Sequence, residues 1–217
     1  MTEAIQEFEH RRLLFIGDSI TDCGRREDER RSLGCGYVAM ITDLLTALYP
    51  RQPVEIINRG IGGDRVVDLE ARWDEDVIAL NPDWLSISIG INDIWRGLSP
   101  LAEVRAQAIH VDHYRDTYRK LLQRVVTETK ARIILMETSI IDEDLASQGN
   151  QRSNEYNRVV QDLADEFKAD LIPINRAFRE AIAAHPGMAW TTDGVHPHPN
   201  GHMLMAVTWL KAMRLLA

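Results

Sequence analysis

Three residues in two distant segments have the types and spacing that nucleophilic catalysis requires. Ser19 stands in Gly17-Asp18-Ser19-Ile20, directly after an apolar run, and Asp193 lies three positions before His196 near the C-terminus. Such a set supplies an attacking hydroxyl, a base that takes its proton, and a carboxylate that orients the base. The chemistry that this set predicts is ester hydrolysis through an acyl-enzyme.

The elements that would position these residues alternate along the chain. Short runs rich in β-branched residues predict strands at 13–16, 54–57, 84–89, 132–136 and 170–173. Helical patterns fill the gaps at 37–48, in part of 66–80, and at 101–129, 152–167, 175–184 and 200–216. Alternation of this kind is typical of a parallel sheet with helices on both faces. We therefore predict an α/β fold, a three-layer α/β/α sandwich with a five-stranded parallel sheet.

The carboxyl ends of these strands would form one edge of the sheet, where ligands bind in such folds. Ser19 follows the first strand, the glycines from Gly60 to Gly63 follow the second, and Gly90-Ile91-Asn92-Asp93 follows the third. The N–H groups of Ser19 and Gly63 and the amide of Asn92 are candidates for an oxyanion hole. Glycine and asparagine after a strand are also common turn or cap residues, and that alternative stays open.

Other polar residues near the candidate triad have structural alternatives. Asp193 and His196 alone are compatible with a hydrogen-bonded turn before the last helix. Asp18 and Asp22 flank the serine, and we expect them chiefly to hold the loop through backbone hydrogen bonds. His198 and His202 are expected to cap or pack. The cluster from Arg25 to Arg31 is expected to be a solvated loop between the first strand and its helix, and a role in shaping the site entrance is the alternative.

The composition limits the classes of protein and partner. A length of 217 residues suits one domain, residues 1–217, and a net charge of −8 disfavours nucleic acid as a partner. No segment is apolar enough for a signal sequence or a membrane span, so we expect a cytoplasmic protein. Cys23 and Cys35 are expected to be free thiols, and Cys23 is a weaker nucleophile candidate than Ser19. His110, Asp112 and His113 are close in sequence, and we expect them to lie on a solvated helix face rather than to bind a metal.

Four sequence blocks, in order, resemble those of the SGNH (GDSL) hydrolases. They are 17–22, 60–63, Gly90-Ile91-Asn92-Asp93 and Asp193-Gly194-Val195-His196-Pro197, and the resemblance extends from Leu13 to about Leu210. It implies the flavodoxin-like SGNH fold, Ser19 as nucleophile, His196 as base and then acid, and Asp193 as the orienting carboxylate. It also implies an oxyanion hole of Ser19, Gly63 and Asn92, and a reaction without metal or cofactor.

Within that superfamily, the segments 14–25 and 89–96 are similar to intracellular acetylxylan esterases, as are Ala71-Arg72-Trp73 and Gly201-His202-Met203. This resemblance implies a small acetylated saccharide, such as an acetylated xylo-oligosaccharide, as substrate, and a homo-oligomer. One departure is that the family has tryptophan directly before the triad aspartate, whereas Thr191-Thr192 separates Trp190 from Asp193.

The tryptophans offer candidate faces for sugar rings. Trp95 and Trp190, together with Asp18, are the candidate substrate contacts, while Trp73 is a further aromatic candidate; core or interface packing is the alternative for each tryptophan. Two other functions stay open. One is a broader acyl esterase, thioesterase or lysophospholipase, and the other is a non-catalytic sugar-binding module, which the complete set of triad and oxyanion residues disfavours.

Overall fold

A parallel sheet runs through the middle of the structure, a computed structural model that describes residues 3–28 and 31–216. Its five strands follow the order β2-β1-β3-β4-β5 and all neighbours are parallel. The strands are β1 (Arg12–Gly17), β2 (Glu55–Gly60), β3 (Trp84–Ser88), β4 (Arg132–Met136) and β5 (Asp170–Ile172). The predicted five-stranded parallel sheet is confirmed.

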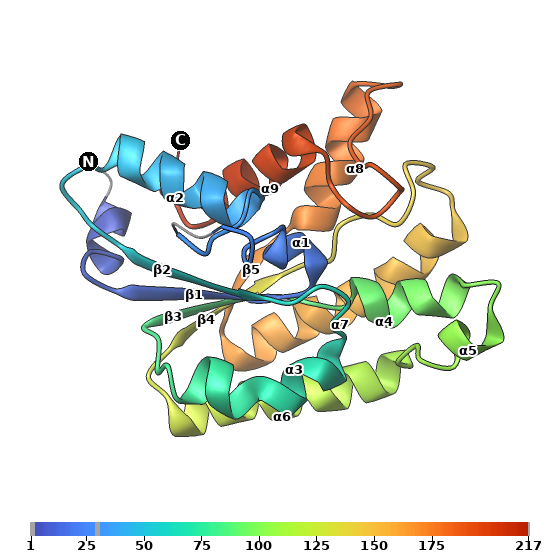
Figure 1. Cartoon of the computed structure of the whole chain (residues 1–217), viewed down its shortest axis with the longest axis horizontal. Helices are drawn as coiled ribbons and strands as arrows, with labels where there is room; N and C mark the ends of the chain where they lie inside the picture. Colours follow the sequence, from blue (N-terminus) through green and yellow to red (C-terminus); the bar gives the residue numbers. More distant parts are fainter. Residues whose placement is uncertain (1–2, 29–30, 217) are drawn as a thin grey trace.

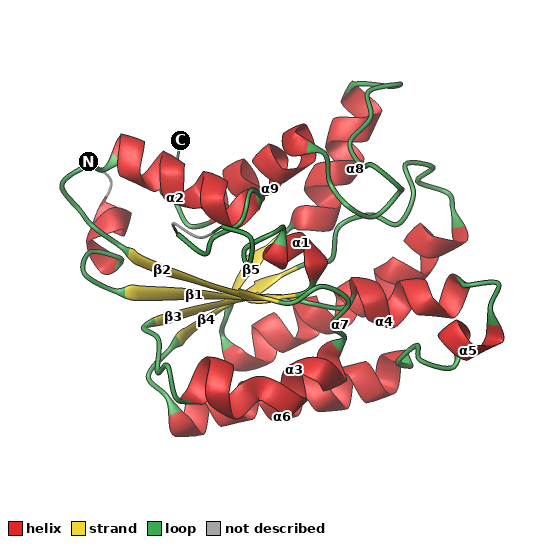
Figure 2. Cartoon of the chain, in the orientation of Figure 1, coloured by secondary structure: helices red, strands yellow, loops and turns green. Residues whose placement is uncertain are grey.

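Helices cover both faces of this sheet, as Figures 1 and 2 show. One layer holds α2 (Tyr37–Leu48), α8 (Ile174–Ala184) and α9 (Pro199–Ala212). The other holds α3 (Val66–Trp73), α6 (Val111–Glu128) and α7 (Gln148–Phe167). The predicted three-layer architecture is confirmed. It explains why β1 and β4 are almost entirely apolar after their first residue, since strands covered on both faces are buried at nearly every position.

Aromatic side chains fix the helices and the N-terminal segment to the sheet. Phe8 stacks on Trp84 with ring centroids 4.3 Å apart, and Phe15 lies 5.6 Å from Trp209 of α9. The indole N–H of Trp209 donates to the hydroxyl of Ser86 on β3 at 3.1 Å. The last helix is therefore held directly on the two central strands that carry the site.

Short helices follow the strands at their carboxyl ends and were not predicted. These are α1 (Ser19–Asp22) after β1 and α4 (Ile91–Trp95) after β3, the latter followed by the 3-10 turn η3 (Arg96–Leu98). A further 3-10 turn, η1 (Glu3–Glu7), precedes β1. One turn of helix is too short to show the periodicity on which prediction depends. Figure 1 shows α1 and α4 at the same end of the sheet, where β1 and β3 end.

The prediction of one helix at 101–129 is wrong, because the chain forms two helices there. These are α5 (Ala102–Arg105) and α6, which begins at Val111 with His110 as its N-cap. The His110 ring accepts from the Asp112 N–H at 3.4 Å, and the Ile109 N–H donates to the Asp93 carbonyl at 3.3 Å. The break therefore anchors the chain beside α4. The region 66–80 likewise divides into α3 and a π-helical turn, η2 (Asp74–Ile78).

Among the described helices, none has both the length and the apolar character that crossing a bilayer requires.

Candidate active site

Ser19 is the first residue of α1, immediately beyond the end of β1. Asp18 is the N-cap of this helix, and its carboxylate accepts from the Ile20 N–H at 3.0 Å. Gly17 makes the sharp exit from the strand possible, because a Cβ there would lie 2.2 Å from the Ser88 carbonyl oxygen. The sequence therefore places a partly buried serine on a tightly constrained turn at the carboxyl edge of the sheet.

The three residues predicted as a triad lie together in one hydrogen-bonded line. Ser19 Oγ is 2.9 Å from His196 Nε2, and His196 Nδ1 is 2.7 Å from Asp193 Oδ2. A carboxylate can only accept at this contact, so the neutral ring carries its proton on Nδ1. His196 Nε2 then presents a lone pair to the serine hydroxyl, which is the arrangement a general base requires.

A hydrogen-bonded turn fixes the positions of Asp193 and His196 relative to each other. Asp193 Oδ1 accepts from the N–H groups of Val195 at 3.0 Å and His196 at 2.9 Å. Thr191 and Pro197 form an antiparallel bridge, and the Thr192 N–H donates to the His196 carbonyl at 2.8 Å. Thr191-Thr192 thus closes the turn. Burial acts to raise the pKa of Asp193, but the hydrogen bonds from His196 and Val195 outweigh it and hold this pKa below its usual value.

The loop after β4 supports this turn through residues that the sequence did not single out. Glu143 Oε1 accepts from the N–H groups of Trp190 at 2.7 Å and Thr191 at 2.8 Å. The Asp142 N–H donates to the Gly194 carbonyl at 2.7 Å. Acidic residues after the fourth predicted strand, at the same edge as Ser19, were the available signal for this role.

The candidate oxyanion residues lie on the other side of Ser19. Gly63 has a φ of +87°, a conformation that favours glycine, and a Cβ built on Gly62 would be 3.9 Å from Ser19 Cβ. Asn92 Nδ2 donates to the Asp64 carbonyl at 3.0 Å. An amide has two N–H groups, so this bond orients the group and leaves one donor available. The structure therefore brings the Gly63 turn to Ser19 and fixes Asn92 on that turn.

Two arginines that the sequence did not indicate as site residues hold the same turn. Arg96 donates to the Gly63 carbonyl at 2.6 Å. Arg72 donates to Asp64 Oδ2 at 2.8 Å and to the Gly17 carbonyl at 3.2 Å. Together they connect the ends of β1 and β2 to α4. Both lie in segments that resemble acetylxylan esterases, but those segments do not indicate their roles, because each acts on a backbone carbonyl that is distant in sequence.

Two buried carboxylates lie directly behind these groups. Asp18 is 2% exposed and Asp93 is fully buried, where both oxygens of Asp93 accept from the Val66 N–H at 3.1 and 3.3 Å. Burial, with the hydrogen bond from Ile20 acting against it, raises the pKa of Asp18 to about 7. Burial likewise raises the pKa of Asp93 to about 7, against the bond from Val66. The burial of Asp18 favours its loop-holding role over contact with substrate.

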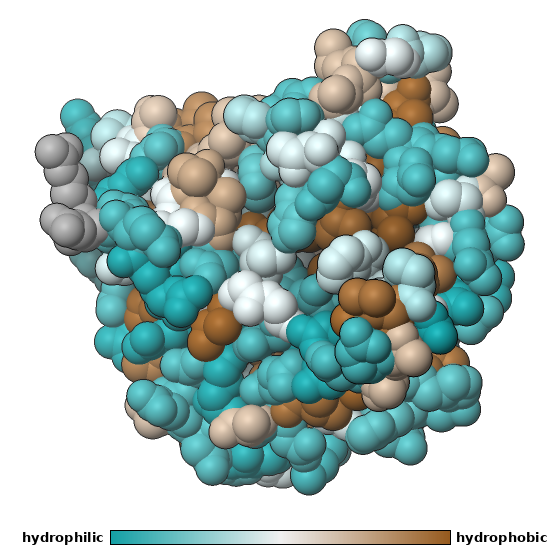
Figure 3. All heavy atoms as spheres, turned by 45° about the vertical axis from the view of Figure 1, so that its right-hand side comes forward, coloured by the Kyte–Doolittle hydropathy of each residue, from teal (hydrophilic) through white to brown (hydrophobic). Residues whose placement is uncertain are grey.

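The three tryptophans that were candidates for sugar contact occupy different environments. Trp95 is 49% exposed, whereas Trp190 is 8% exposed and Trp73 is fully buried in the core. Trp95 lines a hollow of about 250 Å³ that reaches the triad aspartate. The other lining residues are Leu98, Ser99, Pro100, Ile141, Asp142, Asp193, Gly194 and Val195. Figure 3, which turns this edge forward, shows apolar residues reaching the surface here among polar ones.

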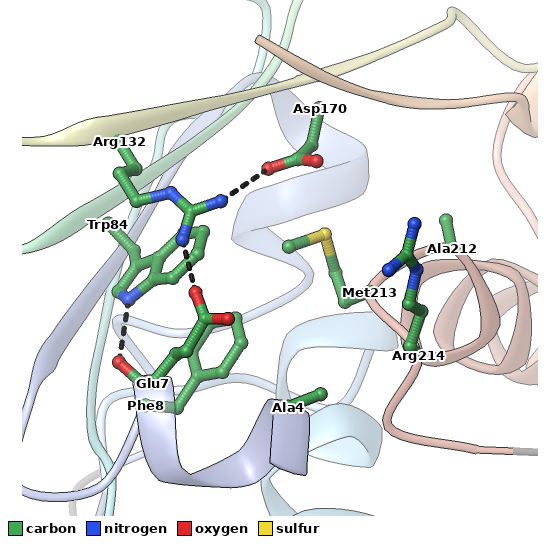
Figure 4. Close-up of a pocket in the computed structure, with 9 residues that line it drawn as sticks. All are labelled: Ala4, Glu7, Phe8, Trp84, Arg132, Asp170, Ala212, Met213 and Arg214. Carbon is green, nitrogen blue, oxygen red and sulfur yellow. Dashed lines mark hydrogen bonds and ion pairs between the residues drawn. The ribbon is translucent and has the colours of Figure 1, made fainter. Parts of the chain in front are cut away.

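A larger hollow of about 500 Å³ lies at the opposite edge of the sheet (Figure 4). Arg132 packs over the Trp84 ring there, 4.2 Å from its centroid, and pairs with Glu7 and Asp170. Trp84, Arg132 and Asp170 are the first residues of their strands, so this hollow is at the amino edge. It contains no triad residue, and the smaller hollow is the candidate substrate site.

The remaining predicted residues have structural partners. The His202 ring accepts from the Tyr37 N–H at 3.2 Å at the start of α2, a capping role, and His198 is the N-cap residue of α9. In the Arg25–Arg31 cluster, Arg25 donates to the Gly60 carbonyl at 2.5 Å, while residues 29–30 lie outside the described residues. Within the described residues, no three His, Cys, Asp or Glu side chains are arranged to hold a metal ion.

The chain is similar to a known protein family and to several known proteins. Residues 15–204 match the GDSL-like lipase/acylhydrolase family. An acetylxylan esterase of Geobacillus stearothermophilus is 41% identical over 204 residues, which is 92% of each chain. Thioesterase 1/protease 1/lysophospholipase L1 of Escherichia coli (strain K12) is 24% identical over 205 residues, covering 94% of this chain and 84% of the relative.

Solved structures agree with these relatives. The crystal structure of the Geobacillus stearothermophilus acetylxylan esterase matches with a TM-score of 0.87 and 40% identity, covering 94% of each chain. An alpha/beta hydrolase enzyme from the metagenome of Lake Arreo, Spain, matches with a TM-score of 0.88 and 29% identity, over 96% of this chain and 97% of the other. Solved catalytic mutants of the Geobacillus enzyme replace a serine, an aspartate and a histidine by alanine.

Proposed function

The chain belongs to the GDSL-like lipase/acylhydrolase family and is a serine esterase, and on that premise we propose that it removes O-acetyl groups from acetylated xylo-oligosaccharides. The observation that carries the proposal is the line from Ser19 through His196 to Asp193, with contacts of 2.9 and 2.7 Å. The 41% identity to an acetylxylan esterase supports the choice of substrate.

In the proposed mechanism, Ser19 Oγ attacks the acetyl carbonyl carbon while His196 Nε2 takes the hydroxyl proton. The negative oxygen of the tetrahedral intermediate accepts from the N–H groups of Ser19 and Gly63 and from the free N–H of Asn92. His196 then protonates the sugar oxygen as the alcohol leaves. Water, activated by His196, attacks the acetyl-serine, and acetate departs. Asp193 keeps the imidazole oriented and stabilises its charged form throughout.

We place the saccharide in the hollow beside Asp193, with the face of Trp95 against a pyranose ring. The Asp142 side chain is exposed at the same hollow, and its Oδ1 already accepts from the Asp144 N–H at 2.9 Å. Its second oxygen is a candidate acceptor for a sugar hydroxyl. Trp190 is buried, so its proposed contribution is packing beneath the triad turn rather than contact with substrate.

The alternative is a broader acyl esterase, thioesterase or lysophospholipase. It is favoured by the apolar residues Leu98, Ile141 and Val195 in the same hollow, and by the Escherichia coli relative. A hollow that takes a sugar ring and one that takes an acyl chain predict opposite preferences for acyl length.

The deciding experiment measures acetate release from acetylated xylo-oligosaccharides beside hydrolysis of 4-nitrophenyl esters of increasing acyl length. The proposal predicts Ser19-dependent release from the saccharide and rates that fall beyond acetyl. Trp95→Ala should lower kcat/KM for the saccharide about tenfold or more while changing 4-nitrophenyl acetate little. Leu101→Ala is the matched control, since Leu101 is 55% exposed and does not line the hollow. Turnover of long acyl esters alone would establish the alternative.

We further propose one catalytic domain over residues 1–217, a cytoplasmic location and a homo-oligomeric state. The buried core that extends from Ile5 to Leu215 supports one domain, and the two free thiols suit a reducing compartment. Light scattering after size-exclusion chromatography tests the oligomer directly. A monomer at micromolar concentration would exclude it.

A further inference from the structure

Two cysteines lie side by side at the C-terminal end of the helix that carries Ser19. Cys23 Sγ and Cys35 Sγ are 3.5 Å apart, although eleven residues separate them in sequence. Cys23 is the C-cap of α1 with a φ of 40°, and its N–H donates to the Ser19 carbonyl at 2.9 Å. The Cys35 N–H donates to the Cys23 carbonyl at 2.9 Å, which fixes the two backbones together.

The surrounding chain packs closely against Cys23. A Cβ on Gly36 would lie 2.8 Å from Cys23 Cβ, and a Cβ on Gly34 would lie 2.6 Å from the Cys23 carbonyl oxygen. Both cysteines are free thiols, and Cys35 is exposed while Cys23 is half-buried. The pair is therefore held in contact with one member open to reagents.

We propose that Cys23 and Cys35 form a reversible modification site, which a low-molecular-weight disulfide such as oxidised glutathione converts into an intramolecular disulfide. The two sulfur atoms, now 3.5 Å apart, must approach to the bonded distance of about 2.0 Å. The oxidised form should hydrolyse esters more slowly, because this approach displaces the cap of the serine helix. That last part rests on the proposed esterase function, whereas disulfide formation does not.

The reaction divides into two exchanges. The Cys35 thiolate attacks one sulfur of oxidised glutathione, forming a mixed disulfide and releasing one glutathione thiolate. Cys23 then loses its proton to solvent and attacks the Cys35 sulfur, forming the internal disulfide and releasing the second glutathione. Two protein thiols are oxidised by two electrons in all, and one glutathione disulfide is reduced to two thiols.

The environments of the two sulfurs set this order. Burial, and then the hydrogen bond and charge of Cys35, raise the pKa of Cys23 to about 12, so Cys23 is a poor first nucleophile. The hydrogen bond and charge of the Cys35 side chain no longer raise this pKa once its sulfur is in the mixed disulfide. His202 Nδ1 accepts from the Tyr37 N–H, so the neutral ring carries its proton on Nε2, 3.4 Å from Cys23 Sγ. That N–H can donate to the Cys23 thiolate as it forms.

The modification would reach both sides of the catalytic serine. The Cys23 N–H is hydrogen-bonded to the Ser19 carbonyl, and the carboxylate of the neighbouring Asp22 accepts from the Gly62 N–H at 3.1 Å. A displacement of Cys23 is therefore transmitted to the nucleophile and to the turn that holds Gly63. Shifts of about 1 Å at such groups can lower rates substantially, and we expect a loss of about tenfold in kcat.

The test treats reduced, full-length protein with oxidised glutathione and follows intact mass, free thiols and 4-nitrophenyl acetate hydrolysis. We expect a mass loss of about 2 Da, the disappearance of both thiols, a lower kcat, and recovery with dithiothreitol. A stable glutathione adduct, or unchanged thiols, would overturn the modification site. A complete disulfide with unchanged kcat would overturn its effect on catalysis.

The control variant is Cys35→Ser, which keeps the Cys23 cap and lies outside the catalytic groups. It should retain basal activity and lose the response to oxidised glutathione. The same loss of kcat in Cys35→Ser would show that the reagent acts elsewhere, contradicting the proposal. If the reduced protein has no esterase activity but forms the disulfide, the proposed function fails and the modification site stands.

Discussion

The groups on the two sides of Ser19 are held in different ways. On one side, Asn92 is 8% exposed and Asp93 is fully buried, and each is bonded to a backbone group of the neighbouring turn. On the other side, the side chains of Asp193 and His196 are 54% and 48% exposed. Their order comes from bonds within a short turn and from Glu143.

This difference follows from what each side must do. Donors that stabilise a developing charge act best when they are already oriented and shielded from water. A base must exchange protons with water in the second half of the reaction, so exposure is compatible with its task. Activity and stability should therefore be coupled on the buried side and separable on the exposed side.

The largest expected effect is that of Ser19→Ala, because Ser19 belongs to both sides. Its Oγ is bonded to His196, while its N–H is a candidate oxyanion donor. The variant loses only the hydroxyl, so kcat should fall by about 10⁴-fold or more while thermal unfolding changes little. Ester hydrolysis and the unfolding midpoint are the measurements. Turnover within tenfold of the wild type would refute the nucleophile assignment.

The next effect separates the two sides by comparing Asn92→Ala with Asp193→Ala. Both should lower kcat by about 10²-fold or more. Asn92→Ala should destabilise the protein more than Asp193→Ala, by about 1–3 kcal/mol, because it leaves the Asp64 carbonyl without its donor at a more buried position. Urea unfolding of both variants gives the free energies. Equal losses of stability would contradict the distinction between the sides.

A smaller effect is expected from Arg96→Ala, which removes the donor to the Gly63 carbonyl. We expect kcat to fall about tenfold with KM nearly unchanged. The Gly63 N–H would lose its orientation toward the transition state, whereas the contacts that bind the substrate before reaction would remain. Binding of a boronic acid, which forms a tetrahedral adduct on serine, should weaken in parallel.

Arg105→Ala is the matched control for that variant. Arg105 also holds loop carbonyls, those of Ser99 at 2.8 Å and Pro100 at 2.7 Å, but not the Gly63 turn. It should leave kcat for 4-nitrophenyl acetate unchanged. An equal fall in both variants would indicate general loosening of the loops and would refute a specific role for Arg96.

The smallest effect concerns pH and the buried side alone. Burial raises the pKa of Asp93 from 3.8 to about 7. Between about pH 4 and pH 7, the folded protein therefore keeps a proton on Asp93 that the unfolded chain has already released. This contribution to stability is complete below about pH 4 and is lost as pH rises to about 7.

Asp93→Asn keeps an acceptor for the Val66 N–H and removes the titration. The free energy of unfolding should therefore fall less between pH 5 and pH 7 than in wild type, by up to about 1 kcal/mol per pH unit. Denaturant titrations at several pH values measure this. Asp116→Asn, at a side chain that is 77% exposed, is the control. The same pH dependence in Asp93→Asn and wild type would show that Asp93 does not titrate in this range.

Much of the fold was predictable because it depends on local patterns. The strand at 132–136 was predicted with its observed bounds, and the alternation of strands and helices gave the layers. The break before α6 was not predictable, because the bond from Ile109 to Asp93 is a tertiary contact. The one-turn helices α1 and α4 carry too few residues for any periodicity.

The site divides in the same way. Ser19, Asp193 and His196 could be selected as candidates because their residue types and spacing are informative by themselves, and the structure brings them within hydrogen-bonding distance. Glu143 and Arg96 were missed because each acts on backbone groups that only the fold brings near. Trp190 precedes Asp193 closely in sequence, yet it is buried, because the fold brings its backbone carbonyl against Gly201 of α9, a contact that the sequence does not show.

The distance of 177 positions between the serine and its base also has a consequence for synthesis in the cell. At about 5–20 residues per second, a ribosome needs roughly 10–35 s after adding Ser19 before it adds His196. Nascent chains and products of premature termination therefore contain the proposed nucleophile without its proposed base. Under the proposed mechanism, we expect acetyl transfer to Ser19 only after the segment that carries His196 has been synthesised.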